Sequence, residues 1–357
     1  MPDVLILCAH RPGRSPSQRY RFEQYLPFLS QHGFNFTWSY LLDEKDDRIF
    51  YSHGNFLKKT SILLKTILIR NRDARRFKNY DIIFIQREAS FLGTSRFERK
   101  AFNSGAKVIF DFDDSIWLED TSPGNKKWSW IKKPAKFFDN IKYASVVIAG
   151  NAYLAEKART INKNTIVIPT TINTDVHFPK PQLRNKDVIT IGWSGSISTV
   201  KHFKLLLPVL EKIKAKYGEK VRFKLIGDKD YKNDKLSVEA VEWKEDTEVD
   251  QLNTIDIGVM PLPEDEWANG KCGLKGLAYM ACGIATIMSN VGVNRDIVRN
   301  GENGFLVKND AEWLDCLSKL IEDNSLREKL GKNARETVIN KYSMEANKNK
   351  YLQVFSE

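Results

Sequence analysis

The sequence predicts an α/β protein of two doubly wound domains in tandem, followed by a helical tail. Short, wholly apolar runs alternate with helix-length segments along most of the 357 residues. That alternation is typical of buried parallel strands joined by right-handed crossovers. A proline-punctuated stretch that comprises Pro169 and the segment from His177 to Pro181 interrupts it near the middle of the chain. Apolar residues then recur at three- and four-residue spacing over 310–357, which predicts helices.

The predicted strands divide evenly between the two halves of the chain. They cover residues 4–9, 82–85, 108–110, 146–149 and 166–168 in the first half, and 188–193, 221–226, 257–260, 284–288 and 305–307 in the second. We therefore expect a first domain at 1–178, a second at 179–342, and a C-terminal helix at 343–357 that packs back on the first domain. Ligands bind outside the carboxyl ends of parallel strands, so the expected site is a cleft between the domains.

Charge is distributed unevenly along the chain. The net charge is +11, and residues 1–180 hold 29 basic and 18 acidic side chains, while the second half is balanced. The first half should therefore face nucleic acid, a membrane surface or a phosphorylated acceptor. An apolar content of 42% excludes collagen-like and disordered classes.

The sequence also indicates the compartment. Four scattered cysteines without a C-x-x-C pair make a disulfide framework and a structural zinc site improbable and fit a reducing cytoplasm. The apolar N-terminus is interpreted as a first strand, not a leader, and no stretch reaches the length needed to span a bilayer. We expect a cytoplasmic protein, soluble or peripheral at the membrane.

A small-residue turn, Gly192 to Ser196, follows the first predicted strand of the second half, with Lys201 on the helix after it. Such a turn lets backbone N–H groups approach a phosphate, although it can also serve tight packing alone.

Residues 270–283 predict a helix closed by Gly283, with Lys271 and Lys275 on its first turns. Two cations at this positive end of the helix favour a bound diphosphate; the alternative is a pair of solvated lysines.

The basic half carries its own candidate groups. Asp111, Asp113 and Asp114 follow a strand, where carboxylates can bind sugar hydroxyls, act as a base, hold Mg²⁺ or cap a helix. Arg14, Arg19 and Arg21 follow the first strand, and Arg87 and His10 lie at equivalent strand ends. These arginines can serve as anion ligands or remain solvated surface charges. Residues 56–76 form an apolar helix flanked by cations, which suits either an anionic membrane or packing on its own sheet.

The motifs from Ile191 to Gly195, Gly270 to Gly283, Ser289 to Asn294 and Gly301 to Phe305 together resemble glycosyltransferase family 4. The resemblance implies the GT-B fold, a retaining reaction with a nucleotide-sugar donor of UDP or GDP type, and no metal or other cofactor. It implies that the second domain binds the donor and that the first contacts a glycan or lipid-linked acceptor. The process that the resemblance implies is cell-surface polysaccharide assembly.

On this basis we assign candidate roles to individual residues. The catalytic candidates are Lys275, Lys201, Asp113 and Arg21; the donor-binding candidates are Gly195, Ser196, Gly227, Trp243, Glu266, Lys271 and Asn294; the acceptor-side candidates are Arg19, Arg87, Asp111 and Asp114. The sequence departs from the family pattern at three positions. Ser196 stands in place of an arginine, and Gly270 and Ala278 stand in place of two glutamates. Glu264, Asp265 or Glu266 are candidates to replace those carboxylates in sugar recognition.

Three alternatives remain open at this stage. A transferase-like protein that binds a donor but turns it over weakly would account for the missing glutamates. The segment 108–115 also resembles the Asp-x-Asp motif of haloacid-dehalogenase-like phosphatases. A nucleic-acid-binding protein is not expected, because no zinc finger or other recognition motif accompanies the charge. The cations of 57–76 and 126–136 instead predict a lipid-linked acceptor at an anionic membrane.

Overall fold

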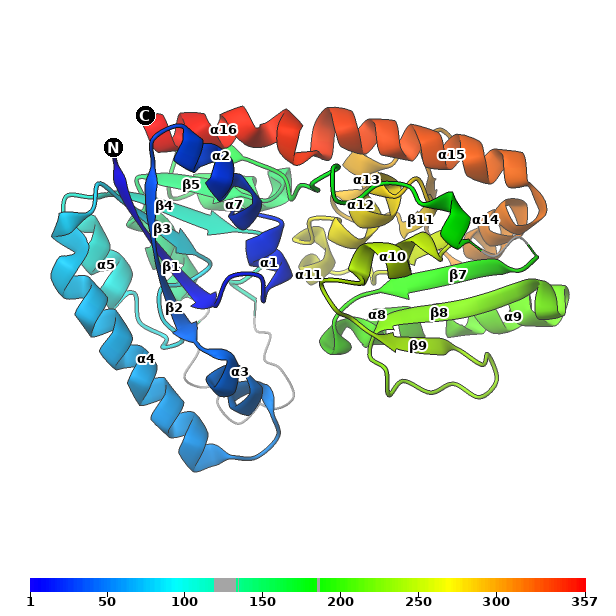
Figure 1. The fold of residues 1–357 in the computed structure, drawn as a ribbon, viewed down its shortest axis with the longest axis horizontal. Coiled ribbons are helices and arrows are strands. Elements are labelled where there is room, and N and C mark those ends of the chain that lie inside the picture. Colours follow the sequence, from blue (N-terminus) through cyan, green and yellow to red (C-terminus); the bar gives the residue numbers. More distant parts are fainter. Residues whose placement is uncertain (119–132, 134, 185–186) are drawn as a thin grey trace. The chain divides into compact units, whose positions relative to one another are not determined.

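The computed structural model describes residues 1–118, 133, 135–184 and 187–357, and the chain divides into two compact units. Unit 1 comprises Met1–Pro169 and Lys348–Glu357, and unit 2 comprises Thr170–Asn347. Each unit contains one parallel six-stranded sheet with helices packed on it (Figure 1). This confirms the predicted α/β class with two doubly wound sheets.

Going along the chain, the first boundary between the two units lies after Pro169. The sequence analysis expected the first domain to end later, at residue 178. The intervening residues bond to unit 2: Ile172 N–H donates to Tyr342 O at 2.9 Å, and Arg335 Nη1 donates to His177 O at 2.9 Å. Those hydrogen bonds attach the segment to unit 2 although its composition is that of a linker. Residues 126–132 and 134 of the predicted basic stretch 126–136 lie outside the described residues.

The sheet of unit 1 has the order β2-β1-β3-β4-β5-β6. Its strands are β1 Asp3–His10, β2 Asn35–Leu42, β3 Ile82–Gln86, β4 Lys107–Phe112, β5 Val146–Ala149 and β6 Thr165–Val167. Neighbouring strands pair in parallel, for example Val4 with Phe36 and with Ile82. The chain adds β2 on one side of β1 and β3 to β6 on the other, so the winding direction reverses between β1 and β3.

The sheet of unit 2 has the order β12-β11-β10-β7-β8-β9, with its reversal between β7 and β10. Its strands are β7 Ile189–Ser194, β8 Val221–Gly227, β9 Glu239–Glu242, β10 Ile257–Met260, β11 Ala285–Ser289 and β12 Phe305–Val307. The chain leaves β7 toward β8 and β9 and later returns to the other side of β7 with β10. Both sheets therefore provide a switch point at which loops diverge and a ligand can enter.

Helices connect these strands in the described part of each unit. Those of unit 1 are α1 Pro16–Arg19, α2 Leu26–Gln31, α3 Glu44–Tyr51, α4 Phe56–Arg76, α5 Arg96–Phe102, α6 Lys136–Lys142 and α7 Ala152–Arg159. Those of unit 2 are α8 Val200–Lys204, α9 Leu207–Tyr217, α10 Glu248–Asn253, α11 Glu266–Asn269, α12 Leu274–Ala281, α13 Asn294–Ile297, α14 Asp310–Glu322 and α15 Asn324–Thr337. Helix α16, Met344–Ser356, begins in unit 2 and ends in unit 1.

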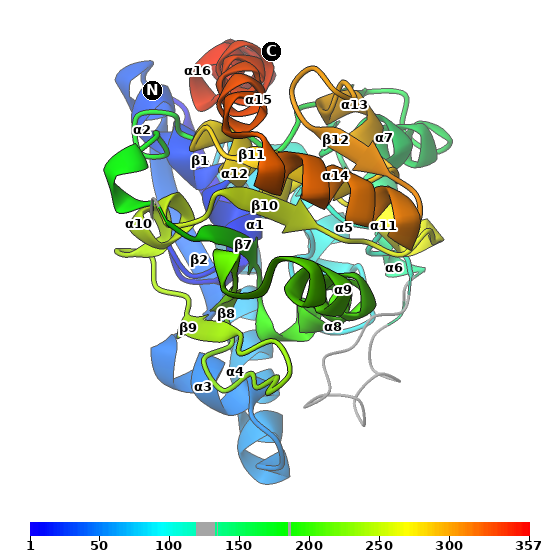
Figure 2. The ribbon, with the colours of Figure 1, turned by 90° about the vertical axis from the view of Figure 1, so that its right-hand side faces the viewer.

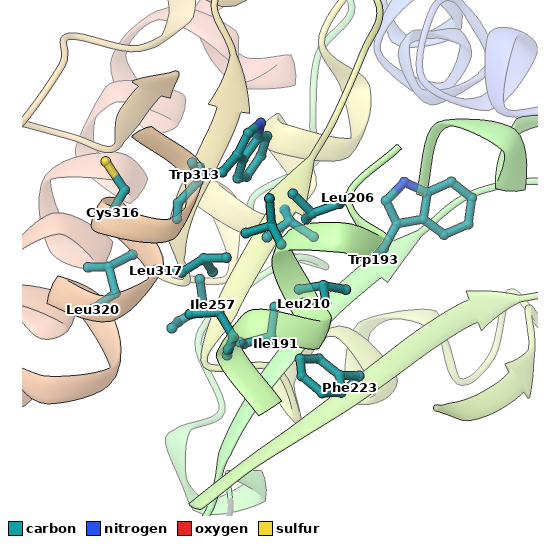
Figure 3. Packing of buried hydrophobic residues seen from close by; sticks show 14 of the residues in the cluster. Ile191, Trp193, Leu206, Leu210, Phe223, Ile257, Trp313, Cys316, Leu317 and Leu320 are labelled. Atoms are coloured by element: carbon teal, nitrogen blue, oxygen red, sulfur yellow. The ribbon is translucent and has the colours of Figure 1, made fainter. Parts of the chain in front are cut away.

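The core of unit 2 lies where α9 and α14 pack side by side on the sheet (Figure 2). Leu210 of α9 and Leu317 of α14 converge on Ile191 and Ile257 of the central strands, and all four are almost fully buried (Figure 3). Burying a side chain of this size stabilises the fold by about 1.5–3 kcal/mol. The central strands β7 and β10 are thus held rigidly, which fixes the positions of the loops that follow them.

Two strands had no counterpart in the sequence-based prediction. Strand β2 mixes polar and aromatic residues and is only partly buried, and β9 is a four-residue strand of glutamate, alanine and valine. Both lie at sheet edges, where one flank faces solvent. A search for wholly apolar runs finds central strands and misses such edges.

The last ten residues pack within unit 1. Tyr351 of α16 stacks on Tyr25 with ring centroids 4.2 Å apart, and Phe355 contacts Phe34 and Phe84. Lys107 Nζ donates to Val354 O at 2.5 Å. The end of α16 therefore contributes aromatic side chains to the core of unit 1, on the same sheet as β1 and β3.

Candidate functional site

Unit 2 presents loops from two strands at its switch point. The loop after β7 contains Gly195 and leads into α8, and the loop after β10 leads through α11 into α12. Because β7 and β10 are neighbours in a parallel sheet, both loops emerge at the same edge. The sequence assigned most of its donor-binding candidates to these two loops.

Two glycine turns pack against each other beside this edge. Gly195 N–H donates to Ile226 O at 2.9 Å, and Gly227 follows with a φ of +139°. A Cβ at Gly227 would lie 1.8 Å from Gly195 O, and one at Gly195 would lie 2.5 Å from the Trp193 ring. Neither position accommodates a side chain without rearrangement, so the backbone around Gly195 comes close to its neighbours and can approach a ligand closely.

Lys275 is brought against this turn from α12. A Cβ at Gly195 would lie 2.6 Å from Lys275 Cε, and the Lys275 ammonium lies 5.6 Å from the centroid of the Trp193 ring. The cation–π contact and the packed stem restrict where the ammonium can lie. The structure therefore places Lys275 beside Gly195, two residues that the sequence assigned to the same site.

The electrostatic surroundings of His202 locate the other two lysines. The pKa of His202 is lowered to about 4, chiefly by burial and then by the charges of Lys275, Lys201 and Lys271, in that order. Three ammonium groups from α8, α12 and the loop before α12 thus act on one imidazole. The structure brings Lys201, Lys271 and Lys275 together, and we call these three side chains the lysine cluster.

The prediction that Lys271 lies on a first helical turn was wrong. Gly273 adopts a left-handed conformation with a φ of +70°, and α12 begins after it at Leu274. Lys271 lies in the preceding loop, where its ammonium is 4.9 Å from the centroid of the Trp267 ring. Its charge nevertheless acts on His202 together with those of Lys201 and Lys275.

The remaining candidates of unit 2 lie at different distances from the switch point along the sheet. Asn294 begins α13, is almost fully buried, and donates from Nδ2 to Ser289 O at 2.9 Å. Its Oδ1 lies 3.7 Å from a Cβ built at Gly273, so it neighbours the start of α12. Ser196 is exposed in the loop after β7, Glu266 begins α11, and Trp243 follows the edge strand β9, away from the switch point. Their roles in binding stay predictions.

In unit 1 the structure pairs two candidates with each other. Arg21 Nη2 lies 2.5 Å from Asp111 Oδ1, and neither side chain has exposed surface. Arg21 also donates from Nη1 to Ile168 O. Burial raises the pKa of Asp111, while Arg21 opposes that rise. The pair links the residue after α1 to β4 and to the end of β6, and a direct contact of either side chain with a substrate stays a prediction.

Arg87 follows β3 at the switch point of unit 1, in the left-handed region with a φ of +62°. It donates from Nε to Asp113 Oδ1 at 2.8 Å, and its Nη2 lies 3.7 Å from Asp114 Oδ2. A non-glycine residue with this backbone is strained by about 1–3 kcal/mol, and such strain gathers at functional sites. The structure thus joins Arg87, Asp113 and Asp114. Arg19, the remaining candidate of unit 1, lies on α1 with its guanidinium over the Tyr20 ring.

The sequence-based prediction missed Asp47, the acidic partner of Arg14 and His10 in unit 1. Asp47 of α3 is almost buried and receives Arg14 Nε at 2.5 Å, with His10 Nδ1 at 3.5 Å. Tyr51 Oη lies 3.4 Å from His10 Nε2. Asp47 comes from a polar helix without a motif, and its partners are more than thirty positions away, so no local signal identifies it.

Within the described ranges, no three His, Cys, Asp or Glu side chains are grouped so that they could hold a metal ion. In the same part of the chain, no helix combines the length and apolar character needed to cross a bilayer. Neither finding bears on residues 119–132, 134, 185 or 186.

Solved structures with this architecture are glycosyltransferases and related enzymes. Sucrose-phosphate synthase from Thermosynechococcus elongatus matches 99% of this chain and 98% of its own, at 15% identity and a TM-score of 0.69. HepE from Anabaena, solved with UDP-glucose, matches the full length of both chains, at 13% identity and a TM-score of 0.68. At these identities the likeness shows the fold, and that fold is GT-B.

Sequence comparison finds a likeness in the second half of the chain. Residues 175–337 match the family model of glycosyl transferases group 1. The capsular polysaccharide biosynthesis glycosyltransferase CapM of Staphylococcus aureus is 36% identical over 93 residues, which span 26% of this chain and 23% of that relative. Residues 175–337, which include the lysine cluster, are therefore similar to the glycosyl transferases group 1 family.

Proposed function

We propose that the protein is a glycosyltransferase that moves a sugar from a nucleotide-sugar donor of UDP or GDP type to a glycan or lipid-linked acceptor. The observation that carries this proposal is the lysine cluster at the switch point of unit 2, beside the packed turns of Gly195 and Gly227. A diphosphate is the group of a nucleotide sugar that needs both cations and close backbone approach. The likeness of this segment to that family supports the same ligand class.

The proposed chemistry follows from the charges. As the bond from the anomeric carbon to the diphosphate breaks, negative charge develops on the leaving phosphate, and Lys201 and Lys275 stabilise it without a metal cofactor. In a retaining front-face reaction the leaving phosphate accepts the proton of the acceptor hydroxyl. NMR of the product tests this directly, because retention gives the anomeric configuration of the donor and inversion would contradict it.

Unit 1 is the proposed acceptor side. Arg87, Arg14 and His10 gather at its switch point with acidic partners, a setting that can exchange internal ion pairs for a substrate phosphate or hydroxyl. The CapM relative supports a place in polysaccharide assembly, which is part of the proposal. The phosphatase alternative is disfavoured, because Asp111, the first aspartate of its motif, is fully buried against Arg21.

We also propose that unit 1 docks on an anionic membrane, at the cytoplasmic face, through α4. Leu57, Leu64 and Leu68 share one face of this helix and are 89%, 58% and 70% exposed. Its opposite face is anchored by Arg70, which is fully buried and donates to Cys8 O at 2.9 Å and to Ser39 Oγ at 2.7 Å. The exposed leucines are therefore not needed to hold α4 on the sheet.

The charge of α4 matches that partner. Lys58, Arg72 and Arg75 are exposed beside the leucines, and the one acidic residue of the helix, Asp73, is fully buried. Apolar side chains flanked by cations bind the boundary between headgroups and acyl chains of an anionic bilayer. The uncovered leucine face combined with this charge favours a lipid surface over a second copy of the chain.

Cosedimentation with vesicles tests the docking. The chain should bind phosphatidylcholine vesicles that contain phosphatidylglycerol, and Leu64→Ser with Leu68→Ser should weaken this binding about tenfold or more, since each leucine loses apolar burial. Ile161→Ser, at another exposed apolar site of unit 1, and Lys329→Glu on α15 serve as controls that should leave it unchanged. Equal binding to uncharged vesicles, or full binding by the leucine variant, would contradict the docking proposal.

A thermal-shift screen of nucleotides and nucleotide sugars tests the catalytic proposal. A donor that binds the folded state raises the melting temperature, and at a given concentration the rise is larger for a tighter ligand. Release of nucleoside diphosphate from the stabilising donor then separates an active transferase from a protein that binds the donor without turnover. Stabilisation by none of these compounds would contradict the proposal.

A further inference from the structure

His202 is a buried titratable group that the proposed chemistry does not use. It lies on α8, directly after Lys201, and only 6% of its surface is exposed. Its Nδ1 is buried and has no hydrogen-bond partner in the part of the chain that the structure describes. A buried, unsatisfied imidazole nitrogen costs free energy unless another state of the protein gives it a partner or a charge to balance.

The charges around His202 come from three further segments. Lys201 precedes it on α8, Lys275 extends from α12, Lys271 lies in the loop before α12, and Asp265 caps α11. Burial disfavours the charged imidazole most, and three cations also outweigh one carboxylate. The folded protein therefore keeps the imidazole neutral at pH 7, consistent with its pKa of about 4. A permanently charged group at this place would repel the lysines; a titratable group avoids that repulsion.

We propose that His202 is the proton-accepting member of the anion site: it is neutral beside the lysine cluster alone and becomes protonated when a diphosphate binds there. A diphosphate carries enough negative charge to offset the lysines, and an opposite charge within about 4–6 Å favours the imidazolium form. The proton comes from solvent and no bond other than that to the imidazole nitrogen forms. This inference rests on the proposed function, whose diphosphate it uses.

The coupling has a size that can be measured. If the pKa of His202 returns to its ordinary value of about 6.5 in the complex, about three quarters of a proton is taken up per diphosphate at pH 6. By linkage the same diphosphate then binds about tenfold more tightly at pH 5.5 than at pH 8 through this group alone. Titration of the diphosphate itself is common to all variants, so a His202 variant isolates the effect.

NMR of the full chain with ¹³C-labelled histidine tests the inference. Five histidines give five Cε1 signals, and the signal lost in His202→Asn identifies that residue. At pH 6 the His202 signal should have the neutral position without ligand and move to the imidazolium position with saturating UDP, GDP or inorganic pyrophosphate. Calorimetry in buffers of different ionisation enthalpy measures the proton uptake on binding. Wild type should show this uptake, and so should the control His32→Asn, which replaces an exposed histidine of unit 1. The uptake should be lost in His202→Asn and in His202→Gln.

The outcomes separate the two claims. Binding of UDP or GDP with a His202 signal that stays neutral, or that is already charged without ligand, overturns the inference and leaves the proposed function standing. Binding of none of the three anions by a folded protein overturns both. Proton uptake that persists in both His202 variants assigns it to another group and overturns the inference.

Discussion

Lys275 is the side chain on which the proposed donor site depends most. Its stem packs against Gly195, and its ammonium lies over the Trp193 ring. Among the three lysines, Lys275 lowers the pKa of His202 most. These contacts hold the ammonium at the edge of the sheet where β7 ends. A group held in position before the reaction stabilises developing charge without reorganisation.

Replacing Lys275 by alanine should therefore lower turnover at saturating donor about 100-fold, which is the usual effect of removing one charge-stabilising group. The assay is nucleoside diphosphate release, with Lys329→Ala on α15 as the matched control. Wild-type turnover in Lys275→Ala would remove this lysine from the mechanism.

Gly227 tests the close packing of the two turns. Gly227→Ala places a Cβ 1.8 Å from Gly195 O, whereas Gly301→Ala, at a φ of +78°, meets no atom within 4 Å. Both variants carry backbone strain of about 1–3 kcal/mol, and only the first displaces the turn. We expect both to lower the melting temperature and Gly227→Ala alone to weaken UDP or GDP binding; equal nucleotide affinity in the two variants would show that the turn does not contribute.

The sequence made neighbouring side chains easier to group in unit 2 than in unit 1. Lys201 and Lys275 were assigned to one site because both follow glycine-containing turns, a signal that is local in the chain; their roles stay predictions. The pairing of Arg21 with Asp111 joins residues ninety positions apart, and no spacing rule reveals it. Burial of His202 was equally invisible, since it depends on packing contributed by other segments.

Among the elements, helix α4 shows that a sequence pattern can predict a helix without predicting which of its faces packs on the sheet. Its apolar and basic residues fitted either packing on the sheet or binding to a surface. In the structure Arg70 anchors one face of the helix by polar contacts, and Leu64 and Leu68 stay exposed on another face. Binding of that exposed face to a membrane stays a prediction. The edge strands β2 and β9 were missed for a related reason, because half-exposed elements carry mixed sequences.

The Arg21–Asp111 pair tests how the elements of unit 1 are joined. Arg21→Met leaves the Asp111 carboxylate buried without its cation, and the free energy of unfolding should fall by about 3–5 kcal/mol. The double variant Arg21→Met, Asp111→Leu removes both charges and should recover most of that loss in urea unfolding. A double variant as unstable as the single one would show that the cost comes from packing, not from the unpaired charge.

For the whole molecule, the uneven charge now has a physical interpretation. The excess of basic residues lies in the first half, where α4 presents cations beside exposed leucines, while the balanced second half concentrates a few lysines at one switch point. Net charge alone did not distinguish nucleic acid, membrane and phosphate. The positions of the charges on the fold favour a diphosphate for unit 2 and an anionic lipid surface for unit 1.

The central claim is that the lysine cluster binds the diphosphate of a nucleotide sugar. Calorimetric titration of the full chain with UDP, GDP and the two nucleosides measures this most directly, in wild type and in Lys201→Ala with Lys275→Ala. One of the two diphosphates should bind far more tightly than its nucleoside, with an affinity that falls as salt rises, and the double variant should reduce that affinity to the level of the nucleoside. Equal affinity for diphosphate and nucleoside, or an unchanged affinity in the double variant, would contradict the claim.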